Sequence, residues 1–197
     1  MRENYQPFEI GNQFIIVPPH ISLTDNERIS LIMERGAFGS GEHETTRSCL
    51  EILEALPPAE NLKILDLGSG TGILSIAALL LNSGRSWCVD VDNVAVKSGQ
   101  RNCQLNGIDD DITHICGTLE QIEEEGFSLV LANIYGDILL DVAEGLVNKA
   151  ASGALLLLSG ILWEYNFDVR QKYQKLGCTL IKNRLLDEFS TILLQKD

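Results

Sequence analysis

The chain has 197 residues, of which 45% are hydrophobic and 22% charged, and its 28 acidic and 15 basic side chains give a formal net charge of −13. This size and composition are typical of one globular domain that buries a real core, and they exclude a disordered chain. The acidic balance argues against nucleic acids and anionic membranes as partners, because binding their phosphates requires a basic face.

The first 35 residues are predicted to be a linker or entry segment rather than part of the core, because a short β-like piece is followed by a polar stretch at 24–27. From Thr45 a helical pattern continues until a proline pair at 57–58 stops it. We expect the main domain to extend over residues 36–197.

Strand-like and helix-like units alternate after this helix. The strands are expected at 63–67, 86–90, 113–116, 127–132 and 154–159, and the helices at 72–81, 93–106, 137–151 and 164–175. Several strands are continuously apolar, which is typical of strands covered by helices on both faces. The pattern predicts an α/β fold with a doubly wound, mostly parallel sheet. Two last strands, at 178–186 and 190–195, are close enough to form an antiparallel edge hairpin.

Residues 66–72, with the sequence DLGSGTG, lie where the first of these strands ends and a helix begins. Glycines there allow a tight turn and let a ligand approach backbone N–H groups. In open α/β sheets, ligands bind at the carboxyl ends of the strands. The alternative is a plain strand-to-helix turn. A dinucleotide fingerprint would need glycine at 73, where the chain has Ile73. The G-x-G-x-G spacing instead resembles the first motif of class I methyltransferases that use S-adenosylmethionine.

Two acids follow the second strand. Asp90 is at its end, where a carboxylate can accept hydrogen bonds from both hydroxyls of a ribose. Asp92 comes directly before the next helix and is expected to be its N-cap.

A glycine-rich loop at 36–47 comes directly before the first helix. It is interpreted either as a capping segment or as a clamp over a ligand, and we favour the clamp. Its His43-Glu44 pair is not a zinc-protease motif, because that motif would need histidine at 47. We expect no metal ligand among His20, His43 and His114.

Asn133 directly follows the apolar strand expected at 127–132. It could cap the next helix, or it could present its amide oxygen to an amine nucleophile. Residues 102–148 around it contain ten acids and no lysine or arginine. This run is interpreted as solvated surface, with attraction of a cationic partner as the weaker alternative.

The chain is expected to be soluble and cytoplasmic. Its five cysteines form no Cys-x-x-Cys pair, and their odd number leaves at least one unpaired, which favours a reducing compartment. Its longest apolar stretch, Ile73–Leu81, is far shorter than the roughly 20 residues that cross a bilayer. Polar residues at the N-terminus are unlike a signal peptide.

Taken together, five segments resemble the PrmA family, the bacterial methyltransferases of large-subunit ribosomal protein eleven. They are the loop at 36–47, the DLGSGTG turn with the helix after it, the segment VDVD at 89–92, ANIY at 132–135 and LSGIL at 158–162. The resemblance covers residue 7 to the C-terminus. Ser40 and Ser69 stand where the family often has threonine and cysteine. The family also has a small N-terminal substrate-recognition domain, which we expect this chain to lack, either by truncation or naturally.

The resemblance implies a seven-stranded sheet that binds S-adenosyl-L-methionine. The expected cofactor contacts are Thr46, Gly68, Ser69, Gly70, Asp90, Asn133, Phe38 and His43. Asn133 is the expected catalytic residue, acting on a lysine or N-terminal amine of a basic, ribosomal protein substrate. The alternatives are a methyltransferase of another protein, a small molecule or a nucleic acid, and a cofactor-binding module without catalysis.

Overall fold

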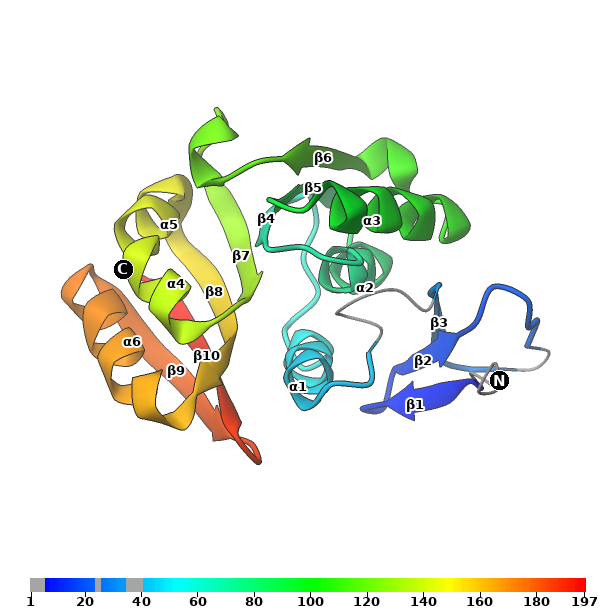
Figure 1. Ribbon diagram of the computed structural model, residues 1–197, viewed down its shortest axis with the longest axis horizontal. Coiled ribbons are helices and arrows are strands. Elements are labelled where there is room, and N and C mark those ends of the chain that lie inside the picture. Colours follow the sequence, from blue (N-terminus) through cyan, green and yellow to red (C-terminus); the bar gives the residue numbers. More distant parts are fainter. Residues whose placement is uncertain (1–5, 24–25, 35–40) are drawn as a thin grey trace.

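The computed structural model describes residues 6–23, 26–34 and 41–197. Figure 1 shows a large sheet with helices on both faces and a small sheet beside it, near the N-terminus. The small sheet contains β1 (Phe8–Ile10), β2 (Phe14–Val17) and β3 (Ile29–Ile32); β2 pairs antiparallel with β1 and parallel with β3.

Among the described residues, seven strands form the large sheet in the order β6-β5-β4-β7-β8-β10-β9. The strands are β4 (Leu62–Leu67), β5 (Gly84–Asp90), β6 (Ile112–Cys116), β7 (Phe127–Asn133), β8 (Ala150–Leu162), β9 (Cys178–Leu185) and β10 (Phe189–Lys196). The pairs from β6 to β8 are parallel, and β10 is antiparallel to both of its neighbours. The doubly wound sheet and its antiparallel edge hairpin are therefore confirmed.

The helices are α1 (Glu44–Leu53), α2 (Ile73–Leu81), α3 (Asn93–Leu105), α4 (Gly136–Asp141), α5 (Ala143–Lys149) and α6 (Trp163–Lys175), with short 3₁₀ turns η1 (Asp109–Asp111) and η2 (Leu119–Gln121). The prediction of one helix at 137–151 is wrong. The backbone at Val142 leaves helical geometry, with φ −89° and ψ 0°, and separates α4 from α5. Residues 150–151 belong to β8, because Ala150 pairs with Phe127 of β7.

Alternate residues of the central strands face two different clusters of buried side chains. Ile64 packs with α1 and α2, whereas Leu65 packs with α4, α5 and α6. This alternation explains why the strands have no polar face: each face is covered by helices.

The residues before 36 contribute to the core. Ile10, Phe14, Ile16, Leu31 and Met33 are fully buried in the same cluster as α1 and α2. The expectation that this segment lies outside the core is therefore wrong for its described residues. The strands β1, β2 and β3 have only three or four residues, and an apolar pattern this short does not distinguish a strand from a loop. The proposed domain boundary at residue 35 remains a prediction.

Candidate functional site

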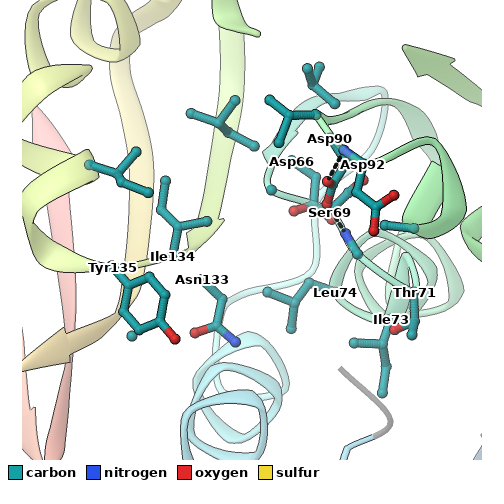
Figure 2. Close-up of a pocket in the computed structure, with 18 of the residues that line it drawn as sticks. Asp66, Ser69, Thr71, Ile73, Leu74, Asp90, Asp92, Asn133, Ile134 and Tyr135 are labelled. Carbon is teal, nitrogen blue, oxygen red and sulfur yellow. Dashed lines mark hydrogen bonds between the residues drawn. The ribbon is translucent and has the colours of Figure 1, made fainter. Parts of the chain in front are cut away.

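A pocket of about 670 Å³ opens at the carboxyl ends of β4, β5 and β7. Its lining includes the glycine turn after β4, Asp90 at the end of β5, Asn133 at the end of β7 and the first turn of α1. Figure 2 shows the side chains of Asp90 and Asn133 on different sides of this pocket. Parallel strands end at the same edge of the sheet, so groups far apart in the sequence meet there.

The glycine turn is shaped by backbone conformations that favour glycine. Gly68, Gly70 and Gly72 have φ values of +69°, +55° and +78°. A Cβ atom at Gly68 would lie 2.3 Å from Cγ2 of Ile134, so a side chain there would collide with the residue after Asn133. The N–H groups of Gly68 and Ser69 both donate to the carbonyl of Val89, at 2.8 and 3.1 Å, which holds the turn against β5.

Asp90 connects this turn to β5. Its Oδ2 accepts a hydrogen bond from the N–H of Gly70 at 2.9 Å, and its Oδ1 accepts one from the N–H of Asp92 at 2.9 Å. Each carboxylate oxygen has a second lone pair, so both can accept a further hydrogen bond. Asp92 accepts from the N–H of Val94 at 2.8 Å and is the N-cap of α3, as predicted.

Asp66, on β4 just before the turn, is 1% exposed and also lines the pocket. Burial raises the pKa of its carboxyl from 3.8 to about 6, although the hydroxyl of Ser75, which donates to Oδ2 at 2.7 Å, acts in the opposite direction. Ser75 is in turn 2.8 Å from the hydroxyl of Ser86 and accepts from the thiol of Cys88 at 3.1 Å. Asp66 was not among the predicted site residues. The signal that could have identified it is an acid inside an otherwise apolar strand.

The start of α1 forms another wall. His43 is the N-cap of α1, and its ring nitrogen accepts a hydrogen bond from the N–H of Thr45 at 3.3 Å. The centroid of its ring is 5.3 Å from that of Phe189, and the two rings pack edge to face. His43 therefore both caps α1 and lines the pocket. At this residue, the interpretations of the loop as a capping segment and as a clamp are compatible. Phe189, from the C-terminal hairpin, is a lining residue that the sequence analysis missed.

Asn133 does not cap the next helix. Helix α4 begins at Gly136, and its N-cap is Tyr135. The amide nitrogen of Asn133 donates to the hydroxyl of Thr46 at 3.4 Å. Its Oδ1 is buried and has no hydrogen-bond partner among the described residues. Such an unpaired acceptor costs free energy unless a ligand or water pairs with it.

The glycine turn, Asp90 and Asn133 with its orphaned oxygen thus line the same pocket. The model of a family described as ribosomal protein L11 methyltransferase (PrmA) matches residues 1–197. The chain belongs to the PrmA family.

Two curated members of the PrmA family are longer than this chain. It is 42% identical over 179 residues to a ribosomal protein L11 methyltransferase of Trichlorobacter lovleyi, covering 87% of this chain and 58% of that protein. A protein of the same name from Geobacter metallireducens is 37% identical over 197 residues, with 98% of this chain and 64% of that protein covered. The chain thus spans about three fifths of the length of these curated relatives.

Solved structures confirm the fold. A ribosomal protein L11 methylase from Lactobacillus delbrueckii subsp. bulgaricus aligns with a TM-score of 0.88 and 23% identity, covering 99% of this chain and 100% of that one. An M. jannaschii tRNA m1G37 methyltransferase aligns with a TM-score of 0.67 and 13% identity over 76% of this chain and 48% of that one. Methyltransferases with different substrates share this fold, so the fold alone does not identify the substrate.

All of the predicted site residues that the structure describes line this same pocket: His43, Thr46, Gly68, Ser69, Gly70, Asp90 and Asn133. Phe38 lies outside the described residues. Their roles toward a cofactor remain predictions for this member of the PrmA family.

In the described parts of the chain, no three His, Cys, Asp or Glu side chains are grouped so that they could hold a metal ion. Burial lowers the pKa of His114, which is not among the pocket-lining residues. No helix within residues 6–23, 26–34 and 41–197 is long and apolar enough to cross a membrane.

Proposed function

We propose that the chain is an S-adenosylmethionine-dependent protein N-methyltransferase that methylates lysine ε-amino or N-terminal α-amino groups. The observation that carries the proposal is one pocket that unites the glycine turn, the Asp90 carboxylate and the orphaned oxygen of Asn133. The curated relatives are named for ribosomal protein L11, and we take this protein as the first substrate to test.

The pocket residues fit the proposed cofactor. Asp90 has acceptor capacity left for ribose hydroxyls beyond its two backbone hydrogen bonds. The turn from Gly68 to Gly72 has no Cβ at its three glycines, so a ligand can approach its backbone closely. The pocket volume of about 670 Å³ is that of an ordinary small-molecule or cofactor site.

When bound, S-adenosylmethionine supplies a methyl group activated by its positively charged sulfur. The work of the protein is to hold an uncharged amine in line with that methyl group and to exclude water. The Oδ1 of Asn133 can accept a hydrogen bond from the amine and so direct the nitrogen lone pair. Thr46 is 0% exposed and holds the other end of the Asn133 amide, which keeps Oδ1 aimed in one direction.

A binding module without catalysis is the competing proposal from another class. Labelled S-adenosylmethionine, incubated with the chain and purified ribosomal protein L11, distinguishes the two. We expect label in the protein at amino groups. Binding of S-adenosylhomocysteine without transfer to L11 or to any protein of a cytosolic extract would favour the module, and tight binding of NAD in its place would contradict both proposals.

Asn133→Ala tests the positioning role. We expect the single-turnover rate of methyl transfer to fall about tenfold or more, while the Kd for S-adenosylhomocysteine changes less, because orientation acts on the chemical step. Asn82→Ala is the control, since Asn82 is the C-cap of α2 and is not among the pocket-lining residues. An unchanged rate in Asn133→Ala would contradict the role.

A further inference from the structure

Helix α3 contacts both the glycine turn of the pocket and the end of β3 in the small N-terminal sheet. Gly99, Asn102, Cys103 and Asn106 are spaced three and four residues apart, so they share one face of this helix and its end. This face contacts the turn and the end of β3, two parts of the chain that are separated in sequence by the glycine-rich loop, α1 and β4.

At the turn, helix and loop backbones approach closely. A Cβ atom at Gly72 would lie 3.6 Å from Cα of Gly99, and a Cβ atom at Gly99 would lie 3.3 Å from the carbonyl oxygen of Gly70. One turn further along α3, the Nδ2 of Asn102 donates to the carbonyl oxygen of Thr71 at 3.0 Å. Asn102 is 0% exposed, so this hydrogen bond is screened from water.

Asn102 and Asn106 also bind the end of β3 and the chain just after it. The Oδ1 of Asn102 accepts from the N–H of Glu34 at 2.9 Å. The amide of Asn106 accepts from the N–H of Ile32 at 2.9 Å and donates to its carbonyl at 2.8 Å. These two side-chain amides supply the donors and acceptors that a neighbouring strand would provide.

We propose that Asn102 is a positioning residue that couples occupation of the pocket to the attachment of β3. One amide holds Thr71 through its nitrogen and Glu34 through its oxygen, so displacing either partner loosens the hold on the other. The proposal rests on the proposed function, because it takes S-adenosylhomocysteine as the ligand of the turn. Coupling between two sites is reciprocal: a ligand that orders the turn must also strengthen the edge of β3.

Asn106 offers a matched control on the same helix. It has the same side chain and also bonds β3, but no hydrogen bond from its side chain reaches the turn within the described residues. Asn102→Asp retains an acceptor for Glu34 and removes the donor to Thr71. Asn106→Asp likewise retains an acceptor for Ile32 and removes the donor. Loss of coupling should therefore be specific to position 102.

Two measurements test the proposal: the Kd for S-adenosylhomocysteine by calorimetry, and amide hydrogen exchange of Ile32 and Glu34 with and without this ligand. In the unmodified chain we expect the ligand to slow exchange at Glu34. In Asn102→Asp we expect the Kd to rise about five- to tenfold, the size of one lost buried hydrogen bond, and the slowing at Glu34 to disappear. In Asn106→Asp the Kd should stay within about twofold and the slowing should persist.

The outcomes separate the two proposals. An unmodified chain that does not bind S-adenosylhomocysteine overturns the proposed function and the coupling together. Binding that leaves exchange at Glu34 unchanged overturns the coupling alone, and this result needs no variant to fold. Equal changes of Kd in Asn102→Asp and Asn106→Asp overturn it as well, because they would show general destabilisation rather than a specific contact.

Discussion

Asp90 and Asp92 are two positions apart, and their carboxylates have different tasks. Both line the pocket, but Asp92 accepts from the N–H of Val94 and caps α3, whereas Asp90 holds the N–H of Gly70 in the glycine turn. Both side chains are aspartates. Their roles differ because their carboxylates accept hydrogen bonds from different backbone N–H groups. This contrast makes the pair a test of the cofactor site.

Asp90→Ala should weaken binding of S-adenosylhomocysteine by about tenfold to a hundredfold, because hydrogen bonds to a charged group contribute roughly 1.5–3 kcal/mol. Asp92→Ala should instead lower the free energy of unfolding by about 1 kcal/mol, the usual loss for an N-cap, and leave the affinity nearly unchanged. Calorimetry and urea unfolding of both variants check this. Equal affinity losses would mean that Asp90 is not the ribose acceptor.

Asp66 predicts a dependence of stability on pH. Its pKa is raised by burial from 3.8 to about 6, so the folded protein resists its ionisation. The free-energy cost of burying the ionised carboxylate is therefore absent below pH 3.8, grows between pH 3.8 and about pH 6, and is present in full above about pH 6. Asp66→Asn removes it and should raise the free energy of unfolding by up to about 3 kcal/mol at pH 8, and by about a third of that near pH 4.5. Urea unfolding at both pH values measures the gain; a gain that did not shrink in acid would contradict the assignment.

At the scale of elements, the first residue of α1 holds the turn between β9 and β10. The carboxylate of Glu44 accepts from the N–H groups of Asp187, Glu188 and Phe189, at 2.9, 3.2 and 3.3 Å. Phe189 at the end of this turn lines the pocket and contacts His43. One carboxylate thus secures the C-terminal hairpin to the helix that begins beside the pocket.

Glu44→Ala should lower the free energy of unfolding by about 2 kcal/mol, because three backbone donors lose a charged acceptor. Glu51→Ala is the matched control on the same helix. Glu51 bonds Arg184 of β9 at 2.6 Å as a partly exposed ion pair, and such pairs contribute about 0–1 kcal/mol. Urea unfolding compares the two, and an equal loss in both variants would contradict the role of Glu44.

At the scale of the whole molecule, charge predicts how a basic substrate approaches. The chain carries a net charge of −13, and Asn133 lies within the run 102–148 that has ten acids and no basic residue. Long-range attraction raises the rate of encounter more than it fixes one amine in the pocket.

At substrate concentrations below saturation, we therefore expect methylation of a basic protein to slow markedly as salt is raised from about 20 to about 300 mM. The added salt screens the electrostatic attraction and shortens its range. The rate at saturating substrate should change little. Asp137→Asn combined with Asp141→Asn should reduce the salt dependence. Steady-state rates across this range of salt provide the test, and rates that do not depend on salt would exclude steering by the acidic surface.

The sequence by itself determined the fold class, the glycine turn and the positions of Asp90 and Asn133. Each of these depends on local information. Continuous apolar runs report burial on both faces, glycines report backbone conformations that other residues avoid, and a polar residue at a strand end reports the edge where ligands bind. The capping role of Asp92 was likewise readable, because a helix N-cap bonds its own first turn.

Only the tertiary structure decided which distant groups meet. Thr46 and Asn133 are 87 residues apart, and Asn102 joins Thr71 and Glu34, 31 and 68 residues away. The core role of the N-terminal strands, the raised pKa of Asp66 and the place of Phe189 in the pocket also appear only on folding. Their physical cause is the same: burial and hydrogen-bond partners depend on how elements pack against one another, and the spacing of residues along the chain does not encode that packing.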